Sequence, residues 1–249
     1  MSFVVTNNAF SKCGLRRAVG ASGFPNEDFT ITWQIYLTAD RTDAFQTYAT
    51  VGPDTFDIQS NYWVCFDGNG AVAHTFALGS DATDTYHGSA TPDLGRWYRM
   101  AYRRRRRGAN DHEQFFYFDL PDTGKVISKD DTDGLTYNTG TDLVFGYAPW
   151  VVNEGITGRM RCLKAFSSVL TPEQLVLESA YADVADHSLQ DSLWGRWPCV
   201  SDGNDSSPNA RHLSINETVT FDNEVAPLWH VWRGGMSEET LRRRFGRSI

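Results

Sequence analysis

The stretch from residue 143 to residue 177 limits the fold more than any other part of the chain. It begins with a short apolar run that stops at Gly146, and a loop that contains Trp150 follows. From Ile156 to Phe166, apolar residues then alternate with charged ones. A period of two is typical of a strand that places one face on a core. The stretch therefore predicts two short strands that are separated by a loop.

A helix start comes directly after these strands. Thr171 can cap the helix, Pro172 suits the first helical position, and Glu173 favours the positive end of the helix dipole. Gln174 stands three residues after Thr171, which is the spacing of a capping box. We therefore expect a helix that begins at Thr171 and reaches about Ala182.

Strand patterns dominate the rest of the chain. Residues 29–37 alternate in polarity, so they are expected to form a strand that buries one face. Further strands are expected at 61–66, 71–78, 97–102, 115–120, 125–128, 193–198 and 212–215. So many short strands predict an all-β fold, a two-sheet antiparallel sandwich or jelly roll. One short helix is expected after the strands of Leu143–Phe166.

The sequence indicates one domain with an appendage. We expect the sandwich domain to span residues 1–221, with its closing strand in the segment 193–215. Residues 222–249 contain Trp229 and Trp232, and then a short segment whose acidic residues precede its arginines. This order suits the helix dipole. We therefore expect a C-terminal helical tail that docks on a partner.

Composition and charge exclude several classes of function. The net charge of -8 argues against binding to nucleic acid or to anionic membranes. No apolar run approaches the roughly 20 residues that span a bilayer, and the N-terminus shows no secretory pattern. The four cysteines lack the spacing of a zinc site. Reduced thiols are favoured, while two bridges with three alternative pairings stay open.

Six short motifs follow one another along residues 25–220. They are Phe29–Trp33, Asp67–Gly70, Gly95–Ala101, Phe115–Pro121, Leu143–Leu175 and Leu193–Leu213. In this order they resemble the concanavalin A-like lectin and glucanase superfamily, in particular its laminin-G-like jelly-roll domains. The sequence departs from the family pattern after Asp119, where Leu120 and Pro121 stand in place of glycine. It also departs at Met160–Cys162, where the family has an acidic residue.

The resemblance implies either a binding protein or a glycoside hydrolase. The glucanases of the superfamily carry an E-x-D-x-x-E strand, which supplies an acid and a nucleophile. No glutamate of this chain has that spacing, and the chain contains no HExxH pair, Gly-x-Ser-x-Gly elbow or phosphate loop. We therefore expect a protein that is not an enzyme. Calcium is common in the superfamily, but Lys129 stands where a calcium loop at 129–134 needs a carboxylate, so no cofactor or metal is expected from a motif.

Residues 103–107 are five consecutive arginines. Because they continue a strand, alternate side chains point to opposite faces. One interpretation is a solvated hairpin end whose arginines pair with Asp111, Glu113 or other acidic residues. The other is an electrostatic clamp on an acidic partner, since guanidinium groups bind carboxylates in a bidentate manner.

The loop between the strands of Leu143–Phe166 offers a candidate sugar site. Tyr147, Trp150 and Asn153 combine aromatic rings with an amide. Exposed aromatic rings and amides on loops suit stacking and hydrogen bonding to saccharides. An aromatic plug over the core is the alternative.

The absent signal, the initial Met and the arginine-rich tail favour assembly with large partners. The leading hypothesis is a non-enzymatic bacteriophage virion component: a capsid decoration or accessory protein, or a tail appendage. It would assemble in the host cytoplasm with other virion proteins or with itself, as a homo-oligomer or symmetric assembly. The expected docking residues are Arg103, Arg105, Arg107, Trp229, Trp232, Arg242, Arg243 and Phe245. The alternatives are an extracellular lectin-like module for cell-surface glycans and a calcium-dependent adhesion domain.

Overall fold

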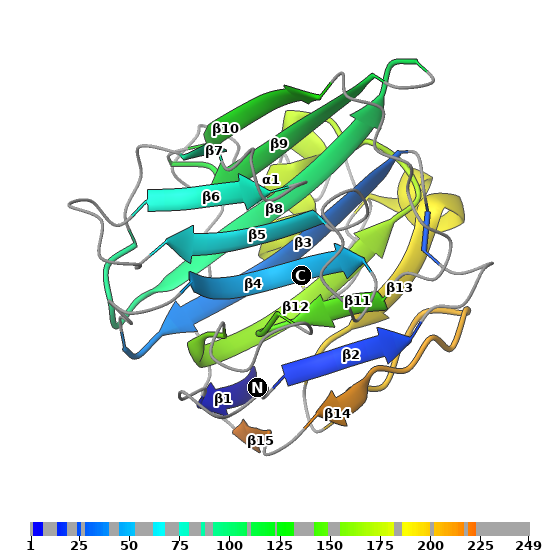
Figure 1. Ribbon diagram of the computed structural model, residues 1–249. Coiled ribbons are helices and arrows are strands. Elements are labelled where there is room, and N and C mark those ends of the chain that lie inside the picture. Colours follow the sequence, from blue (N-terminus) through cyan, green and yellow to red (C-terminus); the bar gives the residue numbers. More distant parts are fainter. Residues whose placement is uncertain are drawn as a thin grey trace, which may run out of the picture.

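The computed structural model places most of the expected strands. The described residues are 2–6, 14–18, 24–25, 28–39, 45–52, 62–67, 75–79, 86–87, 92–108, 111–122, 124–131, 142–148, 155–181, 186–199, 202–216 and 219–222. They form two sheets of antiparallel strands that lie face to face (Figure 1). The predicted all-β, two-sheet antiparallel sandwich is therefore confirmed.

Sheet A contains the longest strands. Its order is β10 (Gly124–Asp131), β9 (His112–Phe118), β8 (Trp97–Arg106), β3 (Phe29–Leu37), β12 (Thr157–Phe166), β1 (Ser2–Thr6) and β15 (Thr220–Asp222), and β13 (Leu193–Trp197) also pairs with β12. The strand predicted at 29–37 has the bounds of β3. The first and last strands, β1 and β15, pair with each other, so both ends of the described chain belong to this sheet.

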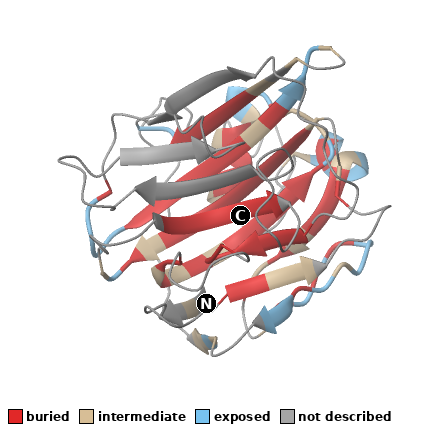
Figure 2. Cartoon of the chain, viewed as in Figure 1, coloured by how far each residue is buried: buried red, intermediate tan, exposed pale blue. Residues whose placement is uncertain are grey.

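Sheet B faces it. Its order is β14 (Ser214–Asn216), β2 (Gly14–Ala18), β11 (Asp142–Phe145), β4 (Phe45–Gly52), β5 (Tyr62–Asp67), β6 (Thr75–Gly79) and β7 (Tyr86–His87). The core lies between the sheets. Trp33 and Tyr98 enter it from sheet A, and Leu143 and Phe145 enter it from sheet B; all four are at most 1% exposed. Figure 2 shows this burial along the central strands of both sheets.

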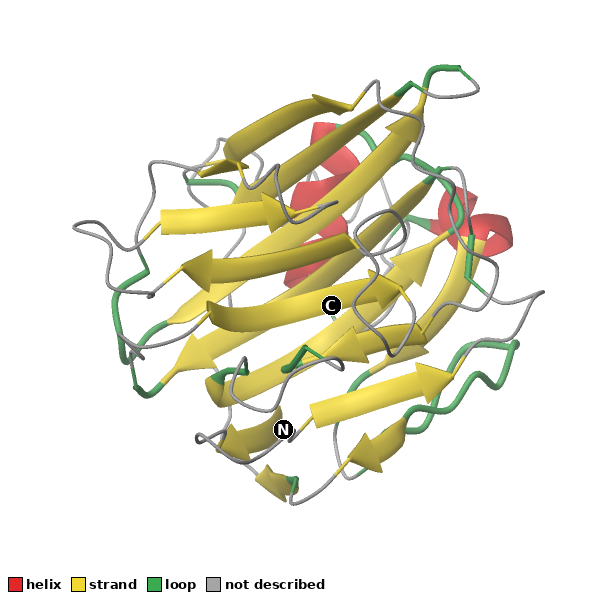
Figure 3. Ribbon diagram, viewed as in Figure 1, coloured by secondary structure: helices red, strands yellow, loops and turns green. Residues whose placement is uncertain are grey.

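A second layer covers the outer face of sheet A. The helix α1 (Pro172–Ala180) packs on β3 and β8, behind the sheet in Figure 3. The 3-10 helix η1 (His187–Ser192) lies beyond it along the chain. A separate apolar cluster lies on this side and consists of Ala101, Phe115, Tyr117, Leu120, Phe166, Leu170, Leu175, Leu189 and Leu193. Only Tyr36 of β3 is partly exposed. The prediction of a half-buried strand at 29–37 is wrong, because its polar face lies under α1.

The helix start at Thr171 is confirmed. The Gln174 N–H donates to Thr171 Oγ1 at 3.3 Å, and the Thr171 N–H donates to Gln174 Oε1 at 2.9 Å. Together these bonds form the predicted capping box. The helix ends at Ala180, two residues before the expected end, and Tyr181 is already extended. The sequence did not indicate η1, which Asp186 caps.

A buried ion pair joins α1 to sheet A. The alternating pattern places Lys164 on a polar face of β12, yet its side chain is 0% exposed. Its Nζ donates to Glu178 Oε2 of α1 at 2.7 Å, and Glu178 Oε1 accepts a bond from the Asp186 N–H at 2.8 Å. Burial lowers the pKa of Lys164. This solvent-inaccessible ion pair therefore holds α1 against sheet A. We call α1 and η1 together the covering layer.

The two strands expected at 193–198 and 212–215 are confirmed, but they belong to different sheets and so do not form one closing strand. β13 pairs with β12 in sheet A, whereas β14 pairs with β2 in sheet B. The turn between them is organised by Asp205, whose carboxylate accepts bonds from the N–H groups of Arg196, Ser207 and Arg211. This buried carboxylate lets the chain cross from one sheet to the other.

The C-terminal tail from 223 onward lies outside the described residues. Its helix and the domain boundary at residue 221 stay predictions. Across the described part of the chain, no helix has the length and apolar character that a membrane span requires.

Candidate functional site

The loop between β11 and β12 has a closed stem. The Gly146 N–H donates to the Tyr48 carbonyl, and the Ile156 N–H donates to the Gly146 carbonyl, both at 2.9 Å. Tyr147 and Gly155 form an antiparallel bridge inside these bonds. Gly146 has a φ of 94°, a left-handed conformation that favours glycine. The two arms of the loop are thus tied together at its base.

Tyr147 belongs to this stem. Its side chain is 1% exposed. A Cβ on Gly14 of β2 would lie 2.6 Å from Tyr147 Cδ1 and 2.2 Å from the Phe145 carbonyl oxygen. The ring therefore packs where a glycine leaves room for it. The sequence placed Tyr147 among the exposed sugar contacts, but the structure gives it the position of the aromatic plug.

The other two predicted sugar contacts, Trp150 and Asn153, lie outside the described residues. They belong to residues 149–154, which we call the loop tip. The tip is flanked by Ala148 and Gly155, and both of these residues are buried. The tip therefore begins and ends on a packed base. The sugar-binding role of Trp150 and Asn153 stays a prediction.

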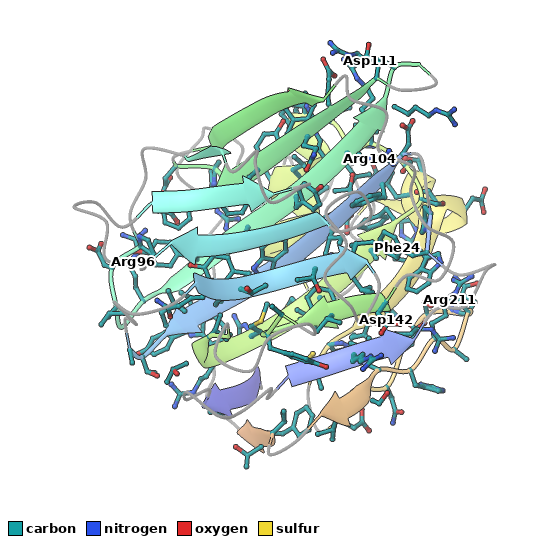
Figure 4. The ribbon with its side chains drawn as sticks, viewed as in Figure 1. Phe24, Arg96, Arg104, Asp111, Asp142 and Arg211 are labelled. Carbon is teal, nitrogen blue, oxygen red and sulfur yellow. The ribbon has the colours of Figure 1, made fainter. Side chains whose placement is uncertain are left out.

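The loop stem and the arginine run lie at opposite ends of sheet A. The Thr38 N–H, just after β3, donates to the Thr157 carbonyl at the start of β12 at 3.0 Å, which places the stem where β3 ends. Arg104 pairs instead with Phe29, the first residue of β3. Figure 4 shows Arg104 far along β8 from Arg96, which precedes the strand. The two candidate regions are therefore separated by the length of the sheet.

The first two arginines of the run contact the covering layer or the interior. Arg103 Nη1 donates to the Leu170 carbonyl at 2.6 Å, and its guanidinium lies 4.5 Å from the centre of the Phe115 ring and 5.1 Å from that of Tyr117. Arg104 is 1% exposed. Arg103 was a predicted docking residue, but its guanidinium contacts the chain itself.

The outer arginines pair with acidic residues of the same hairpin. Arg105 Nε donates to Glu113 Oε2 at 2.7 Å. Arg107 contacts Asp111 at 2.8 Å and Glu113 at 2.9 Å. These are the acidic residues that the hairpin interpretation named, so the predicted pairing is confirmed. The docking role of Arg105 and Arg107 stays a prediction. The docking residues of the tail (Trp229, Trp232, Arg242, Arg243 and Phe245) lie outside the described residues.

A third polar cluster lies before β8, and the sequence did not single it out. Arg96 forms an ion pair with Asp119 and lies over the Tyr98 ring at 4.4 Å. The Asp93 N–H donates to the Tyr98 hydroxyl at 2.6 Å. Burial raises the pKa of Asp119, while Arg96 acts against that shift. The only sequence signal was the departure from the family pattern after Asp119, whose φ is 48°. The cluster joins the start of β8 to the end of β9.

Metal binding has no candidate site in the part of the chain that the structure describes. There, no group of three or more histidine, cysteine, aspartate or glutamate side chains is arranged to hold an ion. The segment 129–134 that was tested as a calcium loop is only partly described. The absence of enzymatic activity stays a prediction, which rests on the sequence.

The sandwich is similar to solved lectin-like structures. One is the native heptameric SAP-like pentraxin from Limulus polyphemus, with a TM-score of 0.59 and 13% identity over 91% of this chain and 95% of that chain. Another is a proposed carbohydrate binding protein from Bacteroides ovatus, with a TM-score of 0.62 and 15% identity over 92% of this chain. The present chain spans 62% of that protein. No protein-family model and no curated protein matches the sequence. At these identities the likeness shows the fold, a lectin-like jelly roll.

Proposed function

We propose that this protein is a non-enzymatic carbohydrate-binding module of the lectin-like sandwich type. The leading hypothesis from the sequence was a virion component, and the lectin-like module was its alternative. We favour the lectin-like module, and the closed stem of the β11–β12 loop supports this choice. We place the saccharide contacts in the loop tip, on Trp150 and Asn153.

The observation that carries this proposal is the closed stem. Two backbone hydrogen bonds and the Tyr147–Gly155 bridge hold the base of the loop, and the flanking Ala148 and Ile156 are 0% exposed. A base that is ordered before binding reduces the conformational entropy that a ligand must offset. By sequence the segment 149–154 contains the aromatic ring of Trp150 and the amide of Asn153. Such a ring can stack on the apolar face of a sugar, and such an amide can bind its hydroxyl groups.

The comparisons add support of a general kind. One protein of similar fold is described as carbohydrate binding and the other as a pentraxin. Loops on rigid sandwiches also carry recognition in many unrelated proteins.

A glycan array tests the proposal. Labelled wild-type protein is expected to bind a subset of immobilised glycans, and Trp150→Ala is expected to lose that signal. Arg105→Ala is the matched control, because it lies at the opposite end of sheet A and is expected to bind as wild type does. Binding to no glycan, or unchanged binding by Trp150→Ala, would overturn the proposal.

The virion hypothesis keeps its own test. Its tail residues lie outside the described residues, and its hairpin arginines contact acidic residues of the same chain. Deletion of residues 222–249 is expected to abolish incorporation into particles if the tail docks there. Retained incorporation would exclude the tail as the docking element.

The third hypothesis was a calcium-dependent adhesion domain. If it holds, a calcium chelator is expected to abolish adhesion.

A further inference from the structure

Two cysteines lie near the point where β12 stops pairing with β1 and starts pairing with β13. β12 pairs with β1 up to Met160 and with β13 from Leu163 onward. Cys162 lies between these two ladders, immediately before the Leu163–Trp197 pair. Cys199 follows β13, two residues after Trp197. The two residues therefore flank the same residue pair of one antiparallel ladder.

Both cysteines have an unusual backbone conformation. The φ angles are 53° at Cys162 and 58° at Cys199, in the left-handed region that few residues other than glycine adopt. Among the residues that the structure describes, only Asp119 and Ala210 are further non-glycine examples. Such conformations persist where the surrounding structure fixes them, and they are frequent at functional positions.

The Cys199 sulfur lies beside the backbone of Leu163. The backbone of Leu163, the residue after Cys162, acts on the Cys199 thiol and counters the rise of its pKa. The thiol also donates to the Trp197 carbonyl at 3.4 Å. Cys162 is 8% exposed and Cys199 is 1% exposed. Burial, with Cys162 as a second cause, raises the pKa of Cys199 well above its usual value.

We propose that Cys162 and Cys199 are a disulfide site, in which oxidation joins β12, at the point where its register with β3 shifts between Arg161 and Lys164, to the residues that follow β13. The structure contains both residues as thiols, which is the reduced form of this pair. Of the alternative pairings that the sequence left open, this one joins two residues at the same end of the β12–β13 ladder. The proposal does not depend on the function proposed above.

A low-molecular-weight disulfide such as oxidised glutathione is the oxidant. The more exposed Cys162 thiol loses its proton and attacks one sulfur of the oxidant, so the sulfur–sulfur bond breaks and one glutathione thiolate leaves. The Cys199 thiol then loses its proton and attacks the Cys162 sulfur of this mixed disulfide, which releases the second glutathione. Two protein thiols are oxidised by two electrons, and one glutathione disulfide is reduced to two thiols. Because the raised pKa leaves little Cys199 thiolate, we expect this second step to be slow.

The bridge would close a loop around the covering layer. The segment between Cys162 and Cys199 contains α1, η1 and β13. A cross-link of this kind restricts the unfolded chain more than the folded one, so it stabilises the fold. The oxidised form is therefore expected to hold the covering layer on sheet A more firmly than the Lys164–Glu178 ion pair does alone.

Refolding in a glutathione buffer tests the site. The protein is unfolded under reduction and refolded with reduced and oxidised glutathione. It is then treated with N-ethylmaleimide, digested and analysed by mass spectrometry. We expect a cross-linked peptide pair that contains Cys162 and Cys199, and an intact mass lower by two hydrogen atoms. Alkylation of both residues by N-ethylmaleimide, or a bridge from either one to Cys13 or Cys65, would overturn the proposal.

Variants separate this pair from the other cysteines. The double variant Cys13→Ser, Cys65→Ser is expected to keep the cross-link, and Cys162→Ser is expected to lose it. In the double variant, oxidation is expected to raise the thermal midpoint by about 5 °C or more. In Cys162→Ser the oxidised and reduced midpoints are expected to agree. If Cys162→Ser does not fold, the double variant still decides the outcome, since absence of the bridge in it contradicts the proposal.

Discussion

The two ends of sheet A use their conspicuous residues in opposite ways. At the β8–β9 hairpin, the guanidinium groups of Arg103, Arg105 and Arg107 contact carbonyl or carboxylate groups of the chain itself. At the β11–β12 loop, the contacts are made by the backbone of the stem, and residues 149–154 lie between its two arms. A run of one charged residue type can therefore stabilise its own hairpin. The backbone contacts of the closed stem involve none of residues 149–154, and we propose that segment as the binding site.

The largest expected effect comes from the stem. Tyr147→Ala removes a ring that is 1% exposed and packs over Gly14, and it is expected to reduce the free energy of unfolding by about 3–5 kcal/mol. Tyr147→Phe keeps the ring and is expected to change the free energy of unfolding by less than about 1 kcal/mol. Urea unfolding measures both. A small loss for Tyr147→Ala would mean that the ring is not part of the base of the loop.

The next effect concerns Arg103, the first arginine of the run. Arg103→Ala removes the bond to the Leu170 carbonyl and the contacts with the Phe115 and Tyr117 rings. We expect a loss of about 2 kcal/mol in urea unfolding, with glycan binding unchanged. If Arg103→Ala abolished binding to a partner without a loss of stability, Arg103 would be a docking residue and the contrast between the two ends would fail.

The smallest effects are expected at the outer arginines. The side chains of Arg105 and Arg107 are 51% and 33% exposed, and partly exposed ion pairs contribute about 0–1 kcal/mol. Replacing each arginine by alanine is therefore expected to change the free energy of unfolding by less than about 1 kcal/mol. The remaining difference from wild type should shrink in about 1 M salt. A loss as large as that of Arg103→Ala, unaffected by salt, would show that these pairs are more strongly coupled than their exposure indicates.

The sequence predicted those helices and strands whose patterns lie within a few neighbouring residues. The bounds of β3 follow from alternation, and the start of α1 follows from a capping box. No strand was predicted at 45–52, where the structure has β4, and there the register shifts between Thr47 and Ala49. Alternation also could not show that the polar face of β3 is covered, because α1 comes more than a hundred residues later.

The contacts of the candidate sites were likewise predictable only where the residues are close together in the sequence. Pairing of the arginines with Asp111 and Glu113 was predictable, since these residues are near in sequence and opposite in charge. The burial of Tyr147 was not, because it depends on Gly14 in a strand far away along the chain. The side chains of Cys162 and Cys199 gave no motif, and only the strand register brings them together.

The central claim is that ligand binding belongs to the β11–β12 loop and not to the arginine hairpin. Its most direct test is a calorimetric titration of one glycan, selected on the array, against wild type, Trp150→Ala and the double variant Arg105→Ala, Arg107→Ala. We expect Trp150→Ala to weaken the affinity by about tenfold or more with an unchanged thermal midpoint. The double variant is expected to bind as wild type does. Wild-type affinity in Trp150→Ala, or loss of affinity in the double variant, would contradict the account.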